Sequence, residues 1–285
     1  MAKIKAREIL DSKGMPTVEV ELEMDFGKFL ASTPSGISTG KYEAVELRDE
    51  DGRGVSRAIE NIEKIITPVL EKEDLTNQRR IDEILIQLDG TKDKSRLGTN
   101  AILPVSIAVC RAGAAVKNFP LYQYIGEIFM GRAYGNLPKP SFNMIEGGKH
   151  AENNLAFQEF MIVPQKDLFK DNLRIGKEIY KSLKEILEKK FGKKNTGLSR
   201  EGAFTAPIQK VTDAFDFILE AAEKTGYKND IKFAIDAAAS SFFGKGGYKI
   251  DDKILLKEKL IDFYKTIIEK EKYPFISIED PFEEE

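Results

Sequence analysis

The run Phe275-Ile276-Ser277-Ile278-Glu279, near the end of the chain, is a short apolar stretch closed by a carboxylate. The run Phe233-Ala234-Ile235-Asp236 has the same arrangement earlier in the sequence. Between them, residues 256–271 place apolar side chains at helical spacing, which predicts a helix with one face in a core. A further strand and two further helices are expected at 157–163, 167–191 and 212–225. Strands alternating with helices favour a mostly parallel α/β sheet.

The two strand-end carboxylates, Asp236 and Glu279, are the first candidates for a site. An ionised carboxylate at the mouth of a buried strand is costly unless a cation or a hydrogen-bond donor meets it. On neighbouring parallel strands the two would converge at one edge of the sheet, and oxygen-only ligation of that kind suits Mg²⁺. From these residues alone, the alternative that each carboxylate caps a following helix stays open.

The first third of the chain predicts a different architecture, a β-meander followed by helices. Strands are expected at 3–9, 17–24 and 28–32. A helix is expected at 55–66, where Thr67-Pro68 ends it, and a second helix is expected to begin at Thr76. Two more are expected, a buried helix at 100–117 and a short helix at 121–130. Four glycines and prolines between Gly131 and Pro140 mark the best domain boundary. We therefore expect one domain over 1–130, a linker over 131–140 and a second domain over 141–285.

Composition excludes several classes of protein. The 285 residues carry a net charge of −3 with both signs interspersed, which argues against a protein that binds nucleic acid. The single cysteine, Cys110, cannot form an internal disulfide, and there is no Cys/His cluster in the sequence for zinc. No signal peptide opens the chain, and residues 101–116 are too short and too weakly apolar for a membrane span. These features predict a cytoplasmic protein.

Common catalytic motifs are missing as well. The stretch from Gly36 to Lys41 has three residues between its glycines instead of the four of a phosphate loop, and Tyr42 follows the lysine. There is no GxGxxG or GxSxG motif, and the single histidine and cysteine form no evident nucleophile–base pair. Phosphate-loop, dinucleotide and serine-hydrolase functions are therefore not expected.

Three other residues are weaker candidates. Glu159 lies in an expected strand, where a regular alternation would make Gln158 face the other way. Glu201 lies in a glycine-containing loop, where an acidic residue is ordinarily solvated. His150, the only histidine, follows Gly147-Gly148, a pair that indicates unusual backbone geometry.

Several collinear stretches, running from residue 3 to residue 282, resemble the enolase (phosphopyruvate hydratase) family. They are Ala6-Arg7-Glu8-Ile9-Leu10-Asp11-Ser12-Lys13-Gly14-Met15-Pro16-Thr17-Val18-Glu19-Val20, Pro34-Ser35-Gly36-Ile37-Ser38-Thr39-Gly40, Gly98-Thr99-Asn100-Ala101-Ile102-Leu103, Gln158-Glu159-Phe160-Met161-Ile162 and Ser277-Ile278-Glu279-Asp280-Pro281-Phe282. The resemblance implies an α+β N-terminal cap domain and a (β/α)8-type barrel that begins ββαα. A barrel typically takes about 250 residues, so about the first half of one would be present here.

The resemblance also implies an activity, the Mg²⁺-dependent dehydration of 2-phosphoglycerate to phosphoenolpyruvate in glycolysis. That reaction is a lyase reaction with two Mg²⁺ ions, carried out by a homodimer when the protein is complete. Asp236 and Glu279 match two of the three carboxylates that bind the first Mg²⁺, and Ser38 matches the loop serine that binds the second. Glu201 matches the acid that protonates the leaving hydroxyl, with Glu159 in its supporting pair. The positions that match substrate contacts are His150, Gln158 and Glu159.

The match is incomplete. The family's third metal carboxylate, its base lysine, its second active-site lysine and its phosphate-binding Arg-Ser pair have no counterpart before residue 285, so we expect this chain alone to be inactive. Glu146 and Glu152 replace neutral residues of the family pattern, and Arg200 stands beside Glu201 where an aspartate is usual. If Arg200 approaches Glu201, it would hold that carboxyl deprotonated. A slow or divergent enolase is the expectation.

Two alternatives remain at this point. One is a truncated or divergent paralogue of enolase that acts as a binding or regulatory protein. The other is an enolase-superfamily enzyme for another acid, which the enolase-like stretches at 34–40 and 158–162 disfavour.

Overall fold

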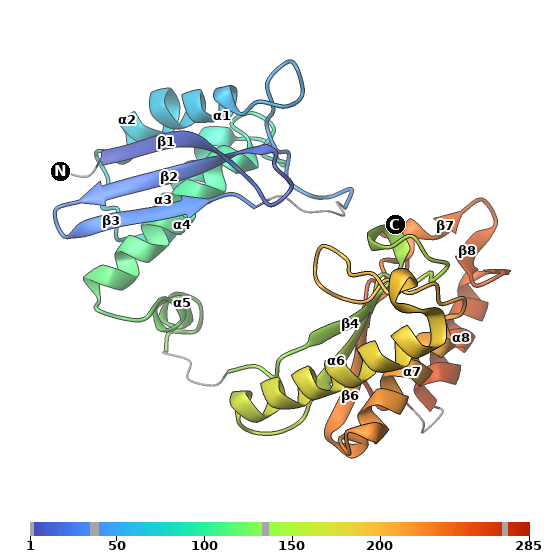
Figure 1. Cartoon of the computed structure of the whole chain (residues 1–285). Coiled ribbons are helices and arrows are strands. Elements are labelled where there is room, and N and C mark those ends of the chain that lie inside the picture. Colours follow the sequence, from blue (N-terminus) through green and yellow to red (C-terminus); the bar gives the residue numbers. More distant parts are fainter. Residues whose placement is uncertain (1–2, 35–39, 133–136, 270–272) are drawn as a thin grey trace. The chain divides into compact units, whose positions relative to one another are not determined.

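The computed structural model divides the chain into two compact units, Met1–Asn136 and Leu137–Glu285. It describes residues 3–34, 40–132, 137–269 and 273–285. Figure 1 shows the helices and strands of both units.

The N-terminal unit is a three-stranded antiparallel meander packed on helices (Figure 1). Its strands are β1 (Lys3–Leu10), β2 (Pro16–Met24) and β3 (Gly27–Ser32). Along β2, apolar side chains alternate with glutamates, and the apolar set is buried. This period of two makes one face of the sheet apolar, and α4 (Thr99–Val116) packs against β2 and β3.

The predicted break at Thr67-Pro68 is wrong. Helix α1 (Ser56–Asn61) runs into a π-helical segment (Ile62–Ile66), and α2 (Thr67–Leu70) follows without a break. Pro68 stands in the first turn of α2, a position where proline, which has no N–H to donate, is tolerated. Helix α3 (Gln78–Asp89) begins after Asn77, whose side chain accepts a hydrogen bond from the Arg80 N–H. Helix α5 (Leu121–Met130) has the predicted bounds.

Among the described residues, α4 is the one helix long and apolar enough to cross a membrane. Half of it is buried inside the structure, where it covers the sheet of its own unit. Its first turn also buries Asn100, whose side-chain amide bonds both the N–H and the carbonyl of Leu47. These contacts are those of a core helix.

The C-terminal unit is built on a four-stranded sheet in the order β10-β6-β5-β4. The strands are β4 (Phe142–Glu146), β5 (Glu159–Pro164), β6 (Ile231–Asp236) and β10 (Phe275–Glu279). Strands β10 and β6 are parallel, but β5 is antiparallel to both β6 and β4. The expectation of a mostly parallel sheet is therefore wrong for this part of the chain.

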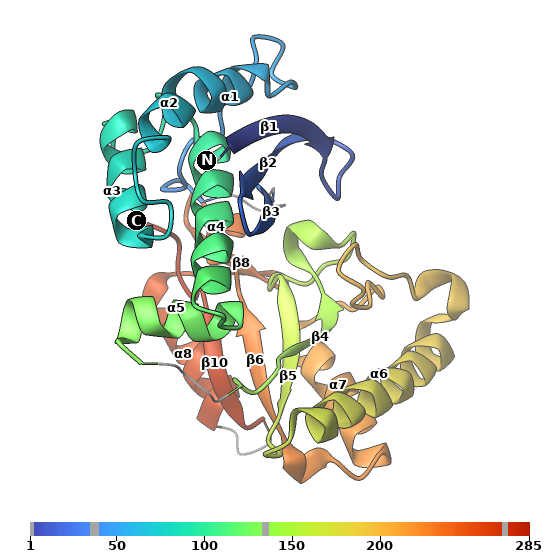
Figure 2. The ribbon, with the colours of Figure 1, turned by 90° about the vertical axis from the view of Figure 1, so that its left-hand side faces the viewer.

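The helices explain the strand directions. Helices α6 (Phe169–Phe191) and α7 (Val211–Lys224) both lie between β5 and β6. Among the described residues between β6 and β10, α8 (Lys257–Glu269) is the one long helix. The chain reverses its direction with each successive helix or strand. Two strands separated by one helix are therefore parallel, and two strands separated by two helices are antiparallel. The order of elements is ββαα followed by β, as the resemblance implied, and it begins a partial barrel (Figure 2).

Aromatic rings fill the core between the sheet and the helices. Phe215 of α7 contacts Phe160 of β5 and Phe233 of β6, with ring centroids 5.1 and 5.5 Å away. A small antiparallel sheet that the sequence does not predict is formed by β7 (Phe243–Gly244), β8 (Gly247–Ile250) and β9 (Lys253–Leu255). Its strands are too short to show a clear alternation.

Candidate active site

Carboxylates line up across the sheet of the C-terminal unit, one from each strand. Glu146 of β4 pairs with Glu159 of β5, Glu159 pairs with Asp236 of β6, and Asp236 pairs with Glu279 of β10. Paired residues on neighbouring strands project from the same face of a sheet. The adjacent pair Phe160 and Ile235 is fully buried in the core, so the carboxylates project from the opposite face. We call these four residues the carboxylate row.

The loops that follow β6 and β10 hold the ends of these strands together. The Ala237 N–H donates to the Glu279 carbonyl at 3.0 Å, and the Ala239 N–H donates to the Asp280 carbonyl at 3.1 Å. Ala238 and Asp280 adopt left-handed backbone conformations, with φ of 46° and 44°. Such conformations are unfavourable for residues other than glycine and cluster at functional sites. The Ala238 N–H also donates to Asp236 Oδ1 at 2.9 Å, which fixes that carboxylate.

Gln158 lies directly beside Asp236. Its Nε2 donates to Asp236 Oδ2 at 2.9 Å, while its Oε1 is buried and has no hydrogen-bond partner. The expectation that Gln158 faces away from Glu159 fails because β5 begins at Glu159, so the alternation of a regular strand does not extend back to Gln158. Both residues therefore adjoin Asp236.

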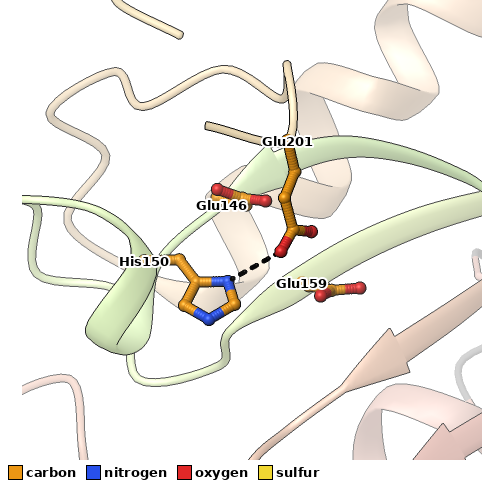
Figure 3. Close-up of side chains that lie close together, drawn as sticks. All are labelled: Glu146, His150, Glu159 and Glu201. Atoms are coloured by element: carbon orange, nitrogen blue, oxygen red, sulfur yellow. Dashed lines mark ion pairs between the residues drawn. The ribbon is translucent and has the colours of Figure 1, made fainter. Parts of the chain in front are cut away.

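A second group of side chains overlaps one end of the carboxylate row. Glu146, His150, Glu159 and Glu201 each offer one ligand atom, and these atoms all lie within 4.8 Å of one another. Figure 3 shows the four side chains pointing towards a common space, with His150 Nδ1 3.7 Å from Glu201 Oε1. We call these residues the His–Glu cluster.

Close backbone packing positions His150. The Gly147 N–H donates to the Gln158 carbonyl at 3.0 Å, and the Gly148 N–H donates to the Leu155 carbonyl at 2.9 Å. A Cβ on Gly147 would lie 2.6 Å from the carbonyl oxygen of Phe157, so only glycine allows this approach. The turn Gly148–His150 then directs the imidazole towards Glu201 (Figure 3).

The electrostatic environment disfavours ionised carboxylates. Burial, together with the charges of Glu201, Asp236, Glu146 and Glu279, raises the pKa of Glu159 to about 7. Burial, together with the negative charge of Glu201, raises the pKa of Glu146 above its ordinary value. Burial, with Glu279 and Asp280 adding, also raises the pKa of Asp236. No Lys or Arg forms an ion pair with the carboxylate row in the described part of the chain. A cation would relieve this repulsion.

The remaining predicted positions lie elsewhere. Ser38 falls outside the described residues. Arg200 is exposed and makes no ion pair within the described ranges, and it is His150 that lies beside Glu201. Glu152 is exposed too. Glu146 is a residue of the site that is not predicted from the sequence, where it stands out only as a departure from a family pattern. The available signal was its position, since it closes strand β4 as Asp236 closes β6.

Comparison with known families identifies the chain. The enolase N-terminal domain matches residues 1–125, and the enolase C-terminal TIM-barrel domain matches residues 135–285. The chain belongs to the enolase family. It is 48% identical to the enolase of Methanothrix thermoacetophila and 46% identical to that of Methanocaldococcus jannaschii. In both cases the match covers 99% of this chain and 67% of the relative. Enolases are lyases and are also called phosphopyruvate hydratases.

The residues present suit the Mg²⁺ that enolases generally use. Asp236 and Glu279 offer carboxylate oxygens on adjacent strands, and Gln158, whose buried Oε1 has no hydrogen-bond partner, lies beside Asp236. Mg²⁺ prefers oxygen ligands, and proteins usually hold it through one or two carboxylates. The donor set and the charge of this end of the row therefore fit the ion.

Proposed function

We propose that this chain carries the metal-holding and acid part of an enolase site for the Mg²⁺-dependent dehydration of 2-phosphoglycerate to phosphoenolpyruvate in glycolysis. The carboxylate row is the observation that carries the proposal, because it gathers negative charge on one face of the sheet with no Lys or Arg paired to it in the described ranges. Asp236 and Glu279 would hold Mg²⁺. When bound, the ion would offset the negative charge that develops on the substrate carboxylate.

The reaction removes a proton from C2 and hydroxide from C3, and a double bond forms between these carbons. Glu201 is the proposed acid, which gives its proton to the departing hydroxyl so that water leaves. Its side chain is 41% exposed, so the proton can be restored from solvent. Glu159, with a pKa of about 7, is protonated in part at neutral pH and can support Glu201 with a shared hydrogen bond. His150 and Gln158 are proposed to contact the substrate.

The proton on C2 needs a base, and the resemblance assigns that role to a lysine with no match among the 285 residues. We therefore propose that this chain alone does not turn over. A second Mg²⁺ bound through Ser38, a homodimer and a cytoplasmic location belong to the same proposal. The alternative, a binding or regulatory protein, would use the same face without chemistry.

A chimera separates these proposals. Residues 1–285 joined to the remaining third of the Methanocaldococcus jannaschii enolase should form phosphoenolpyruvate from 2-phosphoglycerate when Mg²⁺ is present and not when EDTA removes it. The 285-residue chain alone should give no phosphoenolpyruvate above background, because its site has an acid without a base. The ultraviolet absorbance of phosphoenolpyruvate follows both reactions, and the intact archaeal enolase serves as the control.

Two results would contradict the proposal. Turnover by the 285-residue chain alone would show that no further base is needed. A folded chimera without turnover would show that this part of the chain does not carry a working acid and metal site, and it would favour the binding protein.

A further inference from the structure

The His–Glu cluster contains buried polar atoms without partners. The His150 side chain is only 6% exposed, and both of its ring nitrogens are buried with no hydrogen bond in the structure. Glu146 is fully buried, and its Oε2 makes no hydrogen bond of good geometry, although Ser199 and Glu201 lie close to this carboxylate. Its Oε1 accepts a hydrogen bond from Asn143 Nδ2 at 2.9 Å. Buried polar groups are rarely left unpaired, since each costs free energy. These atoms are therefore available to bind a ligand.

The identity of the donors indicates what that ligand is. An imidazole and three carboxylates converge, each with an atom within 4.8 Å of the others (Figure 3). Imidazole nitrogen combined with carboxylate oxygen suits Zn²⁺ and similar transition-metal ions, whereas Mg²⁺ is held by oxygen ligands. The cluster also excludes Asp236 and Glu279, the pair proposed above for Mg²⁺.

We propose that Glu146, His150, Glu159 and Glu201 form a metal site of their own, separate from Asp236 and Glu279 and selective for a Zn²⁺-class divalent ion over Mg²⁺. Glu146 departs from the family pattern that the sequence resembles, in which a neutral residue stands at this position. Its buried carboxylate adds a fourth donor and a negative charge to the cluster.

The site has a consequence for regulation, which rests on the proposed function. A Zn²⁺-class ion held here would occupy Glu201, the proposed acid, and His150, a proposed substrate contact. Such an ion would therefore act as an inhibitor of the completed enzyme. The binding of the ion to the cluster does not itself require that function.

The chain offers a specific probe, because His150 is its only histidine. In the 285-residue protein without a histidine tag, one set of imidazole resonances reports on the cluster. Adding Zn²⁺ should shift these resonances to new positions that saturate at one ion per chain. A large excess of Mg²⁺ should leave them in place. Isothermal titration with Zn²⁺ gives the affinity in the same samples.

Matched variants assign the site. Glu146→Gln keeps the shape of the side chain and removes its charge. We expect it to weaken Zn²⁺ binding by at least about 10- to 100-fold, because removing even a partner of a metal ligand weakens metal binding by that much. Glu201→Gln, in an exposed loop where folding is not at risk, should give a similar loss. Asp236→Asn, outside the cluster, should weaken Zn²⁺ binding far less. Circular dichroism checks that each variant is folded.

The outcomes are decisive in both directions. Imidazole resonances that do not move with Zn²⁺, or Zn²⁺ affinities that are unchanged in both Glu146→Gln and Glu201→Gln, would overturn the metal site in the His–Glu cluster. Mg²⁺ titration of the same variants tests the other proposal separately, since Mg²⁺ binding should depend on Asp236 and not on Glu146. Either site can therefore fail while the other stands.

Discussion

In the chimera that completes the chain, Glu201→Gln is expected to lower kcat about 10²- to 10⁴-fold, the usual range for loss of a general acid. The amide has nearly the same shape as the carboxyl group but has no proton to give to the departing hydroxyl. KM for 2-phosphoglycerate should change much less, because contacts made equally with substrate and transition state are kept. Initial rates of phosphoenolpyruvate formation across substrate concentrations separate the two parameters.

The matched control for this variant is Glu152→Gln. Glu152 is also an acidic residue of a loop in the C-terminal unit, but it is exposed and lies outside the His–Glu cluster. Its replacement should leave kcat unchanged. A chimera that keeps its full kcat with Glu201→Gln would remove Glu201 from the role of acid.

The Phe157→Ala substitution is expected to destabilise the C-terminal unit by about 3–5 kcal/mol, the range for truncating a large aromatic side chain in a core. Phe157 is fully buried, and its ring centroid lies 5.8–6.2 Å from those of four other rings. Those rings belong to Phe160, Phe242, Phe263 and Tyr264. Because Phe157 directly precedes Gln158 and Glu159, its packing also anchors the start of β5 beneath the site.

Urea unfolding of the whole chain, followed by circular dichroism, measures this change in the transition of the C-terminal unit. Phe129→Ala makes the same chemical change at a side chain that is 77% exposed in α5, and its effect should stay within about 0.5 kcal/mol. A loss below about 1 kcal/mol for Phe157→Ala would mean that the aromatic core does not support the site as described.

Local sequence patterns predict part of this site because its chemistry follows short apolar runs. The strands that end at Asp236 and Glu279 are apolar enough to be located from sequence, and each stops at a carboxylate. Their pairing as direct neighbours, and the addition of Glu159 and Glu146 on the same row, depends on strand register. Register is set by contacts between distant parts of the chain, which no local pattern contains.

The direction of β5 differs from the predicted parallel arrangement for a related reason. Apolar spacing indicates that strands and helices alternate, but the direction of a strand depends on how many elements lie between it and the next one. Two helices, α6 and α7, separate β5 from β6, so these strands are antiparallel. The sequence also does not predict that the buried ring nitrogens of His150 lack hydrogen bonds, because the burial of a loop residue depends on how other segments pack around it.

The central claim is that the carboxylate row holds Mg²⁺ through Asp236 and Glu279, and isothermal titration of the 285-residue chain with Mg²⁺ tests it most directly. We expect the wild-type chain to bind Mg²⁺ and Asp236→Asn to weaken binding by at least about tenfold, because a carboxylate ligand is lost where Mg²⁺ is held by only one or two protein carboxylates. Asp252→Asn, in the hairpin between β8 and β9, should bind as the wild type does. Equal Mg²⁺ binding by the wild type and Asp236→Asn, or no binding by the wild type, would contradict the account.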